Sequence, residues 1–424
     1  MLMSGNELNI KAKAARKAAR DLANITGHVK NQALLNIAET LTSSNHEILK
    51  ANEEDYKNGK SDGMSEALLD RLLLDNERLQ LLASDVRAVS NLPDPVGETI
   101  DMRTMPNGLQ VSKRRVPLGV IGAIYESRPN VTVDISVLCL KSGNAVILRG
   151  GKESIHTNKA LVKVIRDSVL CAGIPENTVQ FIESTDREIV GRMLKMKDEI
   201  DLIIPRGGAN LIHRVSEEST IPAITGGIGV CHTYVDRSAN IDMALNIVFN
   251  AKVQRPSVCN ALDTLIVHSD IASEYLPKIG KMWSDAGVEM RCDPASMDIL
   301  SSVVGPSAIP AGQEDWGTEY LSLKASIKIV SSIDEVINHI ETFGTGHSEA
   351  IVTEDYSSAM KFLNEIDSSA VMVNASTRFN DGGEFGLGAE VAISTSKFPV
   401  RGPMGLRELT SYKWIVLGAG HVRE

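Results

Sequence analysis

The sequence has few aromatic residues, no long apolar run and no excess of positive charge. Aromatic side chains make up only 4% of the 424 residues, too few for platforms that stack on bases or sugars. No stretch reaches the roughly 18 apolar residues of a membrane-spanning helix. The 44 basic and 54 acidic residues give a net charge of −10, so the sequence predicts no nucleic-acid partner.

Cysteine is also scarce, with five residues far apart in the chain, at positions 139, 171, 231, 259 and 292. Their odd number and the lack of a C-x-x-C pair argue against a disulfide framework or a zinc site, so we predict no metal. Reduced thiols are typical of a reducing compartment. The N-terminal segment has no apolar core of the secretory kind, so we expect a cytoplasmic protein that begins with a solvated amphipathic helix.

Three common motifs of nucleotide and metal enzymes are missing. They are the G-x-x-x-x-G-K-S/T phosphate loop, a G-x-G-x-x-G sequence after a strand, and H-E-x-x-H. Their absence disfavours a P-loop kinase, an ordinary Rossmann dehydrogenase and a zinc hydrolase.

Short apolar runs alternate with helical stretches from residue 118 onward. Before them come a largely helical segment at 1–90 and a hairpin at 98–116 with an Asn-Gly turn. The predicted strands fall into two series, first 119–124, 145–148, 179–182 and 201–204, then 230–235, 264–268, 327–330, 350–353 and 370–374. Apolar strands separated by helices indicate parallel sheets covered on two sides. The predicted fold class is α/β, with two doubly wound domains in series and a hairpin that leaves the first.

Cys259 is the candidate nucleophile. It lies in a predicted loop before the strand at 264–268, close to the cationic Arg255. A nearby positive charge lowers the pKa of a thiol and favours the reactive thiolate. Spacing alone leaves open the alternative of a packed core cysteine. Cys139 and Cys171, in apolar helical stretches, are expected to be buried, whereas Cys231 and Cys292 have no clear role.

The order of motifs resembles that of the aldehyde dehydrogenase superfamily over nearly the whole chain. These motifs are, in chain order, 117–124 (PLGVIGAI), Arg128-Pro129-Asn130 where the family has Pro-Trp-Asn, 146–153 in place of a strand ending in a cofactor-binding Lys, 204–208 in place of a Thr-Gly-Ser turn, the Cys259 loop, Thr318-Glu319-Tyr320, and 402–414 (GPMGLRELTSYKW). Segments 336–351 and 379–397 are similar to the branch that reduces an acyl phosphate in proline biosynthesis. That resemblance implies NADPH-dependent reduction of L-glutamyl 5-phosphate through a thioester on Cys259.

The resemblance also implies an oxyanion hole and two anion-binding arginines. The Asn130 side chain and the Cys259 backbone N–H would donate to the oxyanion. Read without the resemblance, Asn130 is a helix N-cap for 131–141. Arg128 and Arg255 flank these groups and would steer the anionic substrate, with structural ion pairs as the alternative. Arg378 and Arg401, in a long Gly/Pro-rich segment, are weaker candidates for steering the same anions.

For the cofactor, the resemblance places Arg149, Gly150 and Lys152 near the adenosine ribose. Lys152 stands where NAD-dependent members often carry a Glu, and a cation suits a 2′-phosphate, so NADP is the predicted cofactor. Gly207 and Gly208 would let the pyrophosphate approach a helix N-terminus, and Glu319 would bind the nicotinamide ribose. Ordinary tight turns and a solvated acid are the alternatives.

The resemblance also implies separate parts of the chain for cofactor binding, catalysis and oligomerisation. Residues 1–97 and 117–228 would form the NADP-binding domain, and 229–400 the catalytic domain with Cys259. Residues 98–116 and 401–424, with a strand at 414–420, would form an oligomerisation hairpin and C-terminal strand. Exposed strand edges tend to pair, so we expect a homo-oligomer. A transient contact with the upstream glutamate 5-kinase stays open.

Two other functions remain as alternatives, a hydrolytic aldehyde dehydrogenase and a catalytically inactive scaffold. Hydrolytic members of the family carry a Glu in a Glu-Leu-Gly-Gly motif that activates water, but the matching stretch 223–227 has no carboxylate. Water attack without a general base loses about 10²–10⁴ in rate. Retention of Cys259, Asn130 and Glu319 together argues against the scaffold.

Overall fold

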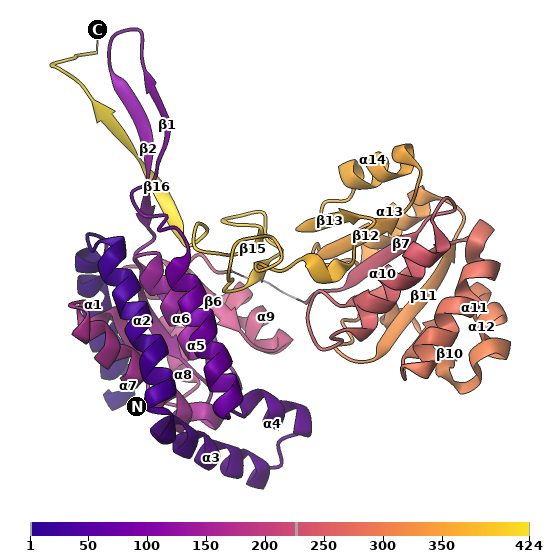
Figure 1. Ribbon diagram of the computed structural model, residues 1–424, viewed down its shortest axis with the longest axis horizontal. Coiled ribbons are helices and arrows are strands. Elements are labelled where there is room, and N and C mark those ends of the chain that lie inside the picture. Colours follow the sequence, from indigo (N-terminus) through magenta and orange to yellow (C-terminus); the bar gives the residue numbers. More distant parts are fainter. Residues whose placement is uncertain (1, 225–227, 424) are drawn as a thin grey trace. The chain divides into compact units, whose positions relative to one another are not determined.

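The computed structural model describes residues 2–224 and 228–423, which form two compact units (Figure 1). Among these residues, unit 1 comprises 2–224, 386–392 and 403–423, and unit 2 comprises 228–385 and 393–402. No helix in this part of the chain combines the length and the apolarity that crossing a bilayer requires.

Unit 1 is built on a parallel sheet of four strands in the order β5-β4-β3-β6. The strands are β3 (Val120–Tyr125), β4 (Ala145–Arg149), β5 (Val179–Phe181) and β6 (Leu202–Arg206). Every residue of β3, β4 and β5 is buried, as strands covered on both faces require. The first predicted series of strands is confirmed to within two residues at each end.

Helices cover both faces of this sheet. On one face, α1, α8 and α9 share a core with alternate strand residues such as Val120 and Ile147. On the other face, α6 and α7 contact the sheet and α2, α3 and α5 pack outside them. The bounds are α1 (Leu2–Leu22), α2 (Gly27–Ser43), α3 (Asn45–Ser61), α4 (Glu66–Leu72), α5 (Asn76–Asn91), α6 (Asn130–Lys141), α7 (Ile155–Cys171), α8 (Glu188–Met193) and α9 (Ala209–Glu218).

The cysteines of these helices differ in burial. Cys139 is buried in α6, as expected, and burial raises the pKa of its thiol far above the ordinary range. The expectation for Cys171 is wrong, because this residue is exposed. It is the last residue of α7 and follows the exposed Leu170.

A three-stranded antiparallel sheet projects from unit 1 (Figure 1). In it, β1 (Thr99–Thr104) pairs with β2 (Gln110–Pro117), and β2 pairs with β16 (Thr410–Leu417). Gly108 has a φ of 92°, the left-handed conformation that the Asn-Gly turn predicted, so the hairpin is confirmed. The last strand begins at Thr410 rather than at 414, because pairing with β2 continues to Pro117.

Unit 2 is built on a parallel sheet of seven strands in the order β10-β9-β11-β8-β7-β12-β13. The strands are β7 (Cys231–Val235), β8 (Leu262–His268), β9 (Glu289–Cys292), β10 (Ala308–Pro310), β11 (Lys324–Val330), β12 (Ser348–Val352) and β13 (Ala370–Val373). The sequence prediction missed β9 and β10, because three or four residues of mixed polarity show no clear alternation. Cys292, for which the sequence indicated no clear role, ends β9 and is buried.

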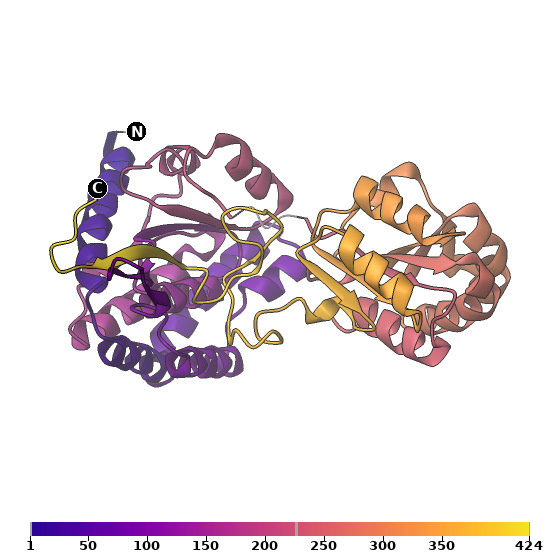
Figure 2. The same ribbon diagram turned by 90° about the horizontal axis from the view of Figure 1, so that it is seen from above.

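The helices of unit 2 lie on both faces of this sheet (Figure 2). Leu265 and Val267 of β8 pack with one group of helices, and Ile266 between them packs with the other, as the two-residue period of a strand requires. The first group is α10 (Ile241–Val253), α11 (Ser269–Asp285) and α12 (Pro294–Val304), and the second is α13 (Ile333–Phe343) and α14 (Tyr356–Glu365). The predicted doubly wound α/β fold is confirmed.

The remaining elements are short. They are the 3-10 turns η1 (Lys152–Ser154), η2 (Glu176–Thr178), η3 (Gly305–Ser307), η4 (Gln313–Gly317) and η5 (Thr377–Phe379), and the paired strands β14 (Ile393–Ser394) and β15 (Gly402–Pro403).

Gly119 allows a charged contact between α1 and the sheet of unit 1. Both carboxylate oxygens of Asp201 accept hydrogen bonds from Arg16, at 2.7 and 3.0 Å. One of them, Oδ2, also accepts from the backbone N–H of Val120 at 2.7 Å. A Cβ atom on Gly119 would lie 2.2 Å from that oxygen, and its φ of 129° is unfavourable for any other residue.

We expect Gly119→Ala to lower the free energy of unfolding by more than the roughly 1–3 kcal/mol of backbone strain alone. The additional loss comes from displacing Asp201 from Arg16 and Val120. The measurement is the midpoint of urea unfolding. Gly173→Ala is the matched control, because Gly173 also has a positive φ, 83°, but no atom lies within 4 Å of its added Cβ. Equal losses in the two variants would contradict the role of the ion pair.

Candidate active site

Cys259 lies in unit 2, half-buried on the loop between α10 and β8, as predicted. The loop begins where α10 ends, three residues before Pro256, which has no backbone N–H to continue a helix. It ends where Leu262 enters the buried strand β8. The loop therefore holds Cys259 just before β8, a strand in the interior of the seven-stranded sheet.

Gly229 lies directly against the main chain of Cys259. A Cβ atom on Gly229 would lie 2.0 Å from the carbonyl oxygen of Cys259, so no other residue fits. The backbone N–H of Gly229 donates to Oε1 of Glu319 at 2.9 Å. Burial raises the pKa of this half-buried Glu319, an effect that the hydrogen bond from Gly229 opposes. Glu319 is thus not a fully solvated acid. Sequence reasoning missed Gly229, although it ends a glycine-rich stretch.

Cys231 lies beneath the Cys259 loop. Its thiol is 3.1 Å from the carbonyl oxygen of Cys259 and 3.4 Å from that of Gly229. Burial, together with the charges of Asp263 and Glu349, raises its pKa well above the ordinary value. Cys231 therefore remains a thiol that donates to a carbonyl, a contact between residues 28 positions apart that the sequence did not predict.

A chain of buried polar groups continues from Cys231. Nδ1 of His347 lies 3.7 Å from the Cys231 sulfur and 2.7 Å from the hydroxyl of Ser348. That hydroxyl accepts from Nδ2 of Asn380 at 2.9 Å, and the Asn380 carbonyl accepts from Nδ2 of Asn260 at 3.1 Å. Burial lowers the pKa of His347 to about 4, so its ring is neutral at pH 7. This series of hydrogen-bonded groups begins and ends beside Cys259.

The arginines that the sequence singled out separate into different environments. Arg255 is exposed on the Cys259 loop. Nε of Arg378, in η5, donates to Oε1 of Gln254 at 2.8 Å, which brings a second guanidinium to the same loop. Arg401 instead pairs with Asp367 at 2.6 Å. Arg128 lies in unit 1.

Asn130 is the first residue of α6 in unit 1. The cap position belongs to Pro129, without a side-chain hydrogen bond, so the N-cap interpretation of Asn130 is wrong. Its Nδ2 donates to Oδ2 of Asp134 at 2.9 Å. Burial of the Asp134 carboxyl raises its pKa to about 7, and the negative charge of Asp85 adds to this effect.

The first cofactor candidates follow β4. Arg149 is buried, and its Nη1 and Nη2 donate to the carbonyls of Gly150 and Thr185 at 3.1 and 3.0 Å. A Cβ on Gly150 would lie 2.2 Å from Nδ2 of Asn158, so this turn needs glycine for close packing. Lys152 is exposed at the start of η1.

The second cofactor candidates are Gly207 and Gly208, exposed at the start of α9. The backbone N–H of Gly208 donates to Oε2 of Glu126 at 3.1 Å. A Cβ on Gly207 would lie 2.5 Å from that same oxygen. An anionic oxygen therefore lies at this helix N-terminus in the structure, and a phosphate oxygen has the same chemistry.

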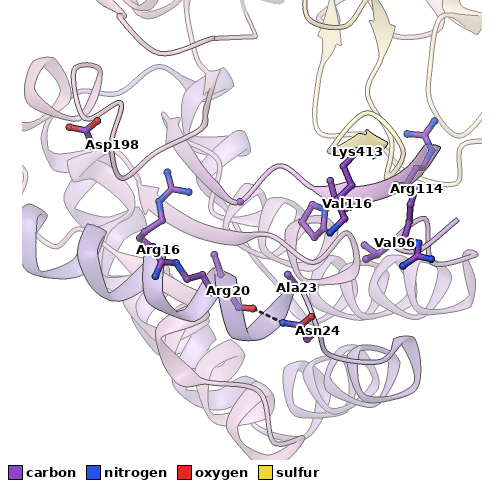
Figure 3. Close-up of a pocket in the computed structure, with 14 residues that line it drawn as sticks. Arg16, Arg20, Ala23, Asn24, Val96, Arg114, Val116, Asp198 and Lys413 are labelled. Atoms are coloured by element: carbon purple, nitrogen blue, oxygen red, sulfur yellow. Dashed lines mark hydrogen bonds between the residues drawn. The ribbon is translucent and has the colours of Figure 1, made fainter. Parts of the chain in front are cut away.

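A separate cavity of about 740 Å³ lies where the projecting sheet joins unit 1 (Figure 3). Arg16, Arg20, Arg114 and Lys413 line it, but none of the predicted site residues does. Arg114 and Lys413 are direct neighbours on β2 and β16. The candidate active site is thus not in this cavity.

The chain belongs to the aldehyde dehydrogenase family, whose model matches residues 3–299. Its full-length relatives include gamma-glutamyl phosphate reductases. The protein of that name from Dehalococcoides mccartyi is 57% identical over 417 residues, which cover 98% of each chain. The crystal structure of gamma-glutamyl phosphate reductase from Thermotoga maritima matches with a TM-score of 0.96 and 48% identity, covering 99% of this chain and 100% of that one.

A more distant structure shares the fold alone. An engineered glycolyl-CoA reductase with bound NADP+ has a TM-score of 0.70 and 18% identity, over 97% of this chain and 96% of that one. The family that the motifs predicted is confirmed, and with it an oxidoreductase that uses a nicotinamide cofactor.

Asp134 yields a pH-dependent prediction. Its pKa is about 7 in the folded chain, against an ordinary 3.8, so the unfolded chain binds fewer protons between about pH 4 and 7. Wild-type stability therefore falls as pH rises through this window. Asp134→Asn removes the titration and should gain stability over the wild type between pH 5 and pH 8. Within this window, each pH unit changes the free energy of unfolding of the wild type by at most about 1.4 kcal/mol.

Urea unfolding of both proteins at the two pH values measures this effect. A stability difference that is the same at pH 5 and pH 8 would contradict the raised pKa.

Proposed function

We propose that this protein reduces L-glutamyl 5-phosphate to L-glutamate 5-semialdehyde and phosphate with NADPH, the second step of proline biosynthesis. The observation that carries the proposal is the half-buried Cys259 on a loop fixed by Gly229 and Cys231, with Arg255 and Arg378 beside it. The 57% identity to a gamma-glutamyl phosphate reductase over nearly the full chain supports the same substrate.

The thiolate of Cys259 attacks the acyl carbon of the substrate. A C–S bond forms while the C–O bond to phosphate breaks, and phosphate leaves with the electron pair, so the acyl group becomes a thioester. NADPH, when bound, would supply a hydride to the thioester carbonyl. The resulting thiohemiacetal collapses, which frees the thiol and releases the semialdehyde.

Both steps pass through an oxyanion, which takes N–H donors from the Asn130 side chain and the Cys259 main chain. The hydrogen bond from Asn130 to Asp134 uses one N–H of the amide and holds the amide plane, so that the second N–H has a defined direction. Arg128 and Arg255 bind the anionic groups of the substrate.

The residues present fit NADP. The N–H of Gly208 already binds a carboxylate oxygen, which supports Gly207 and Gly208 as the pyrophosphate site. The Arg149 guanidinium is bound to carbonyls and supports the turn at Gly150, so Lys152 is the cation for the 2′-phosphate. Glu319 binds the nicotinamide ribose through the carboxylate oxygen that Gly229 does not use.

The protein forms homo-oligomers through β16, an edge strand with exposed Tyr412, Trp414 and Val416. Five free cysteines support a reducing cytoplasm. The main alternative function is hydrolytic oxidation of an aldehyde. It requires a general base, for which 223–227 offers no carboxylate; residues 225–227 lie outside the described part of the chain.

Oxidation of glutamate semialdehyde by NADP shows whether phosphate or water attacks the thioester. We expect the rate to depend on inorganic phosphate and the product to be the acyl phosphate, because phosphate is an anionic nucleophile that needs no general base. Cys259→Ala is the control and should retain less than about a hundredth of the wild-type rate, with NADPH binding unchanged. Steady release of glutamate in phosphate-free buffer would establish the hydrolytic alternative.

Lys152→Glu tests the cofactor. The variant places a carboxylate against the 2′-phosphate, so the Kd for NADPH should rise by about tenfold or more, while that for NADH changes little. Fluorescence titration of both cofactors measures the two constants, and Lys159→Glu, an exposed lysine on α7, is the control. If Lys152→Glu weakened the binding of NADPH and of NADH equally, Lys152 would not contact the 2′-phosphate.

A further inference from the structure

Arg378 is attached to both ends of the Cys259 loop. Its Nε donates to Oε1 of Gln254, at the beginning of the loop. Its carbonyl accepts from Nδ2 of Asn260, the residue after Cys259, at 3.4 Å. Its own N–H donates to the hydroxyl of Ser376 at 3.3 Å, so the main chain of η5 is also held locally. The Arg378 guanidinium thus has a defined position relative to the nucleophile.

The charge of Arg378 has no ion-pair partner among the described residues, in contrast to Arg401 of the same segment. Arg378 binds Gln254, the residue directly before Arg255, so both cations lie at the same loop. Burial lowers the pKa of Arg378, and the positive charge of Arg255 lowers it further. Asp381 and Cys259 act in the opposite direction. The Asp381 carboxylate accepts the backbone N–H of Gly383 at 2.8 Å and does not pair with Arg378.

Arg255 and Arg378 have no carboxylate partner among the described residues, so two guanidinium groups beside the nucleophile are available to bind an anion. A guanidinium fork matches the oxygens of phosphate in two parallel hydrogen bonds, and only one of the Arg378 nitrogens, Nε, is used by Gln254. The substrate carries a phosphate and an α-carboxylate. The phosphate is bonded to the carbon that Cys259 attacks, whereas three further carbons separate that carbon from the α-carboxylate, so the group beside the sulfur is the phosphate.

We propose that Arg378 and Arg255 form a phosphate subsite, which holds the departing phosphate of the acyl phosphate and binds inorganic phosphate in the reverse reaction. This inference rests on the proposed function. In the reverse direction, an oxygen of HPO4²⁻ bonds to the thioester carbon and the C–S bond breaks. The electron pair leaves with the Cys259 sulfur, and the phosphate proton passes to the thiolate or to water.

The test is the phosphate dependence of semialdehyde oxidation in Arg378→Gln. The apparent KM for inorganic phosphate should rise by about tenfold or more, the usual effect of losing a charge-assisted hydrogen bond, while the KM for NADP stays unchanged. Arg378→Lys keeps the charge but loses the guanidinium fork, so its phosphate KM should lie between those of the wild type and Arg378→Gln. Arg401→Gln is the matched control and should leave the phosphate KM at the wild-type value, because the charge of Arg401 is already paired with Asp367.

A second readout needs no turnover. Inorganic phosphate should slow the alkylation of Cys259 by iodoacetamide in the wild type and in Arg401→Gln, but not in Arg378→Gln. If Arg378→Gln does not fold, Gln254→Ala replaces it, because it releases the guanidinium without removing the charge and should raise the phosphate KM in the same direction.

The outcomes separate the inference from the proposed function. A wild-type protein that oxidises the semialdehyde to glutamate without phosphate would overturn the proposed function and the subsite with it. The subsite alone would be overturned if the wild type depends on phosphate but the phosphate KM of Arg378→Gln lies within about twofold of the wild-type value.

Discussion

The close approach of two main chains, at Gly229 and Cys259, is the constraint on which the candidate active site depends. No side chain fits at position 229, because its first carbon would lie 2.0 Å from the Cys259 carbonyl oxygen. This approach brings the Cys231 thiol within 3.1 Å of that carbonyl and the N–H of Gly229 within reach of Glu319. A larger residue at 229 would move the nucleophile loop and break these contacts together.

Hydrogen bonds rather than apolar packing orient this loop. His347, Ser348 and Asn380 are buried, and buried polar groups are costly unless they are paired. Here each has a partner in a chain that runs from the Cys231 thiol to the Asn260 side chain. Because the His347 ring is neutral, the chain adds no buried charge beside the thiol. Among the described residues, the buried side-chain oxygens of Asn260 and Asn380 have no partner, but the connected hydrogen bonds of this network favour one arrangement of the loop.

The arginines show how one residue type serves two purposes. Arg16 and Arg401 each pair with a carboxylate and join segments of their own unit. Arg378 uses a neutral amide, Gln254, as its partner, so its charge is not cancelled. The first arrangement contributes to the fold, whereas the second leaves a cation for a ligand.

The sequence by itself determined the α/β class, the hairpin and the loop position of Cys259, because these depend on local periodicity and on turn residues such as Gly108. Periodicity fails where an element is short, as for β9 and β10, or where burial depends on which side of a helix faces solvent, as for Cys171. Only the tertiary structure decided which side chains meet. Cys231 meets Cys259 across 28 residues, and Gln254 meets Arg378 across 124 residues of sequence. Such pairings depend on distances between segments far apart in the chain, and no local pattern of residues records those distances.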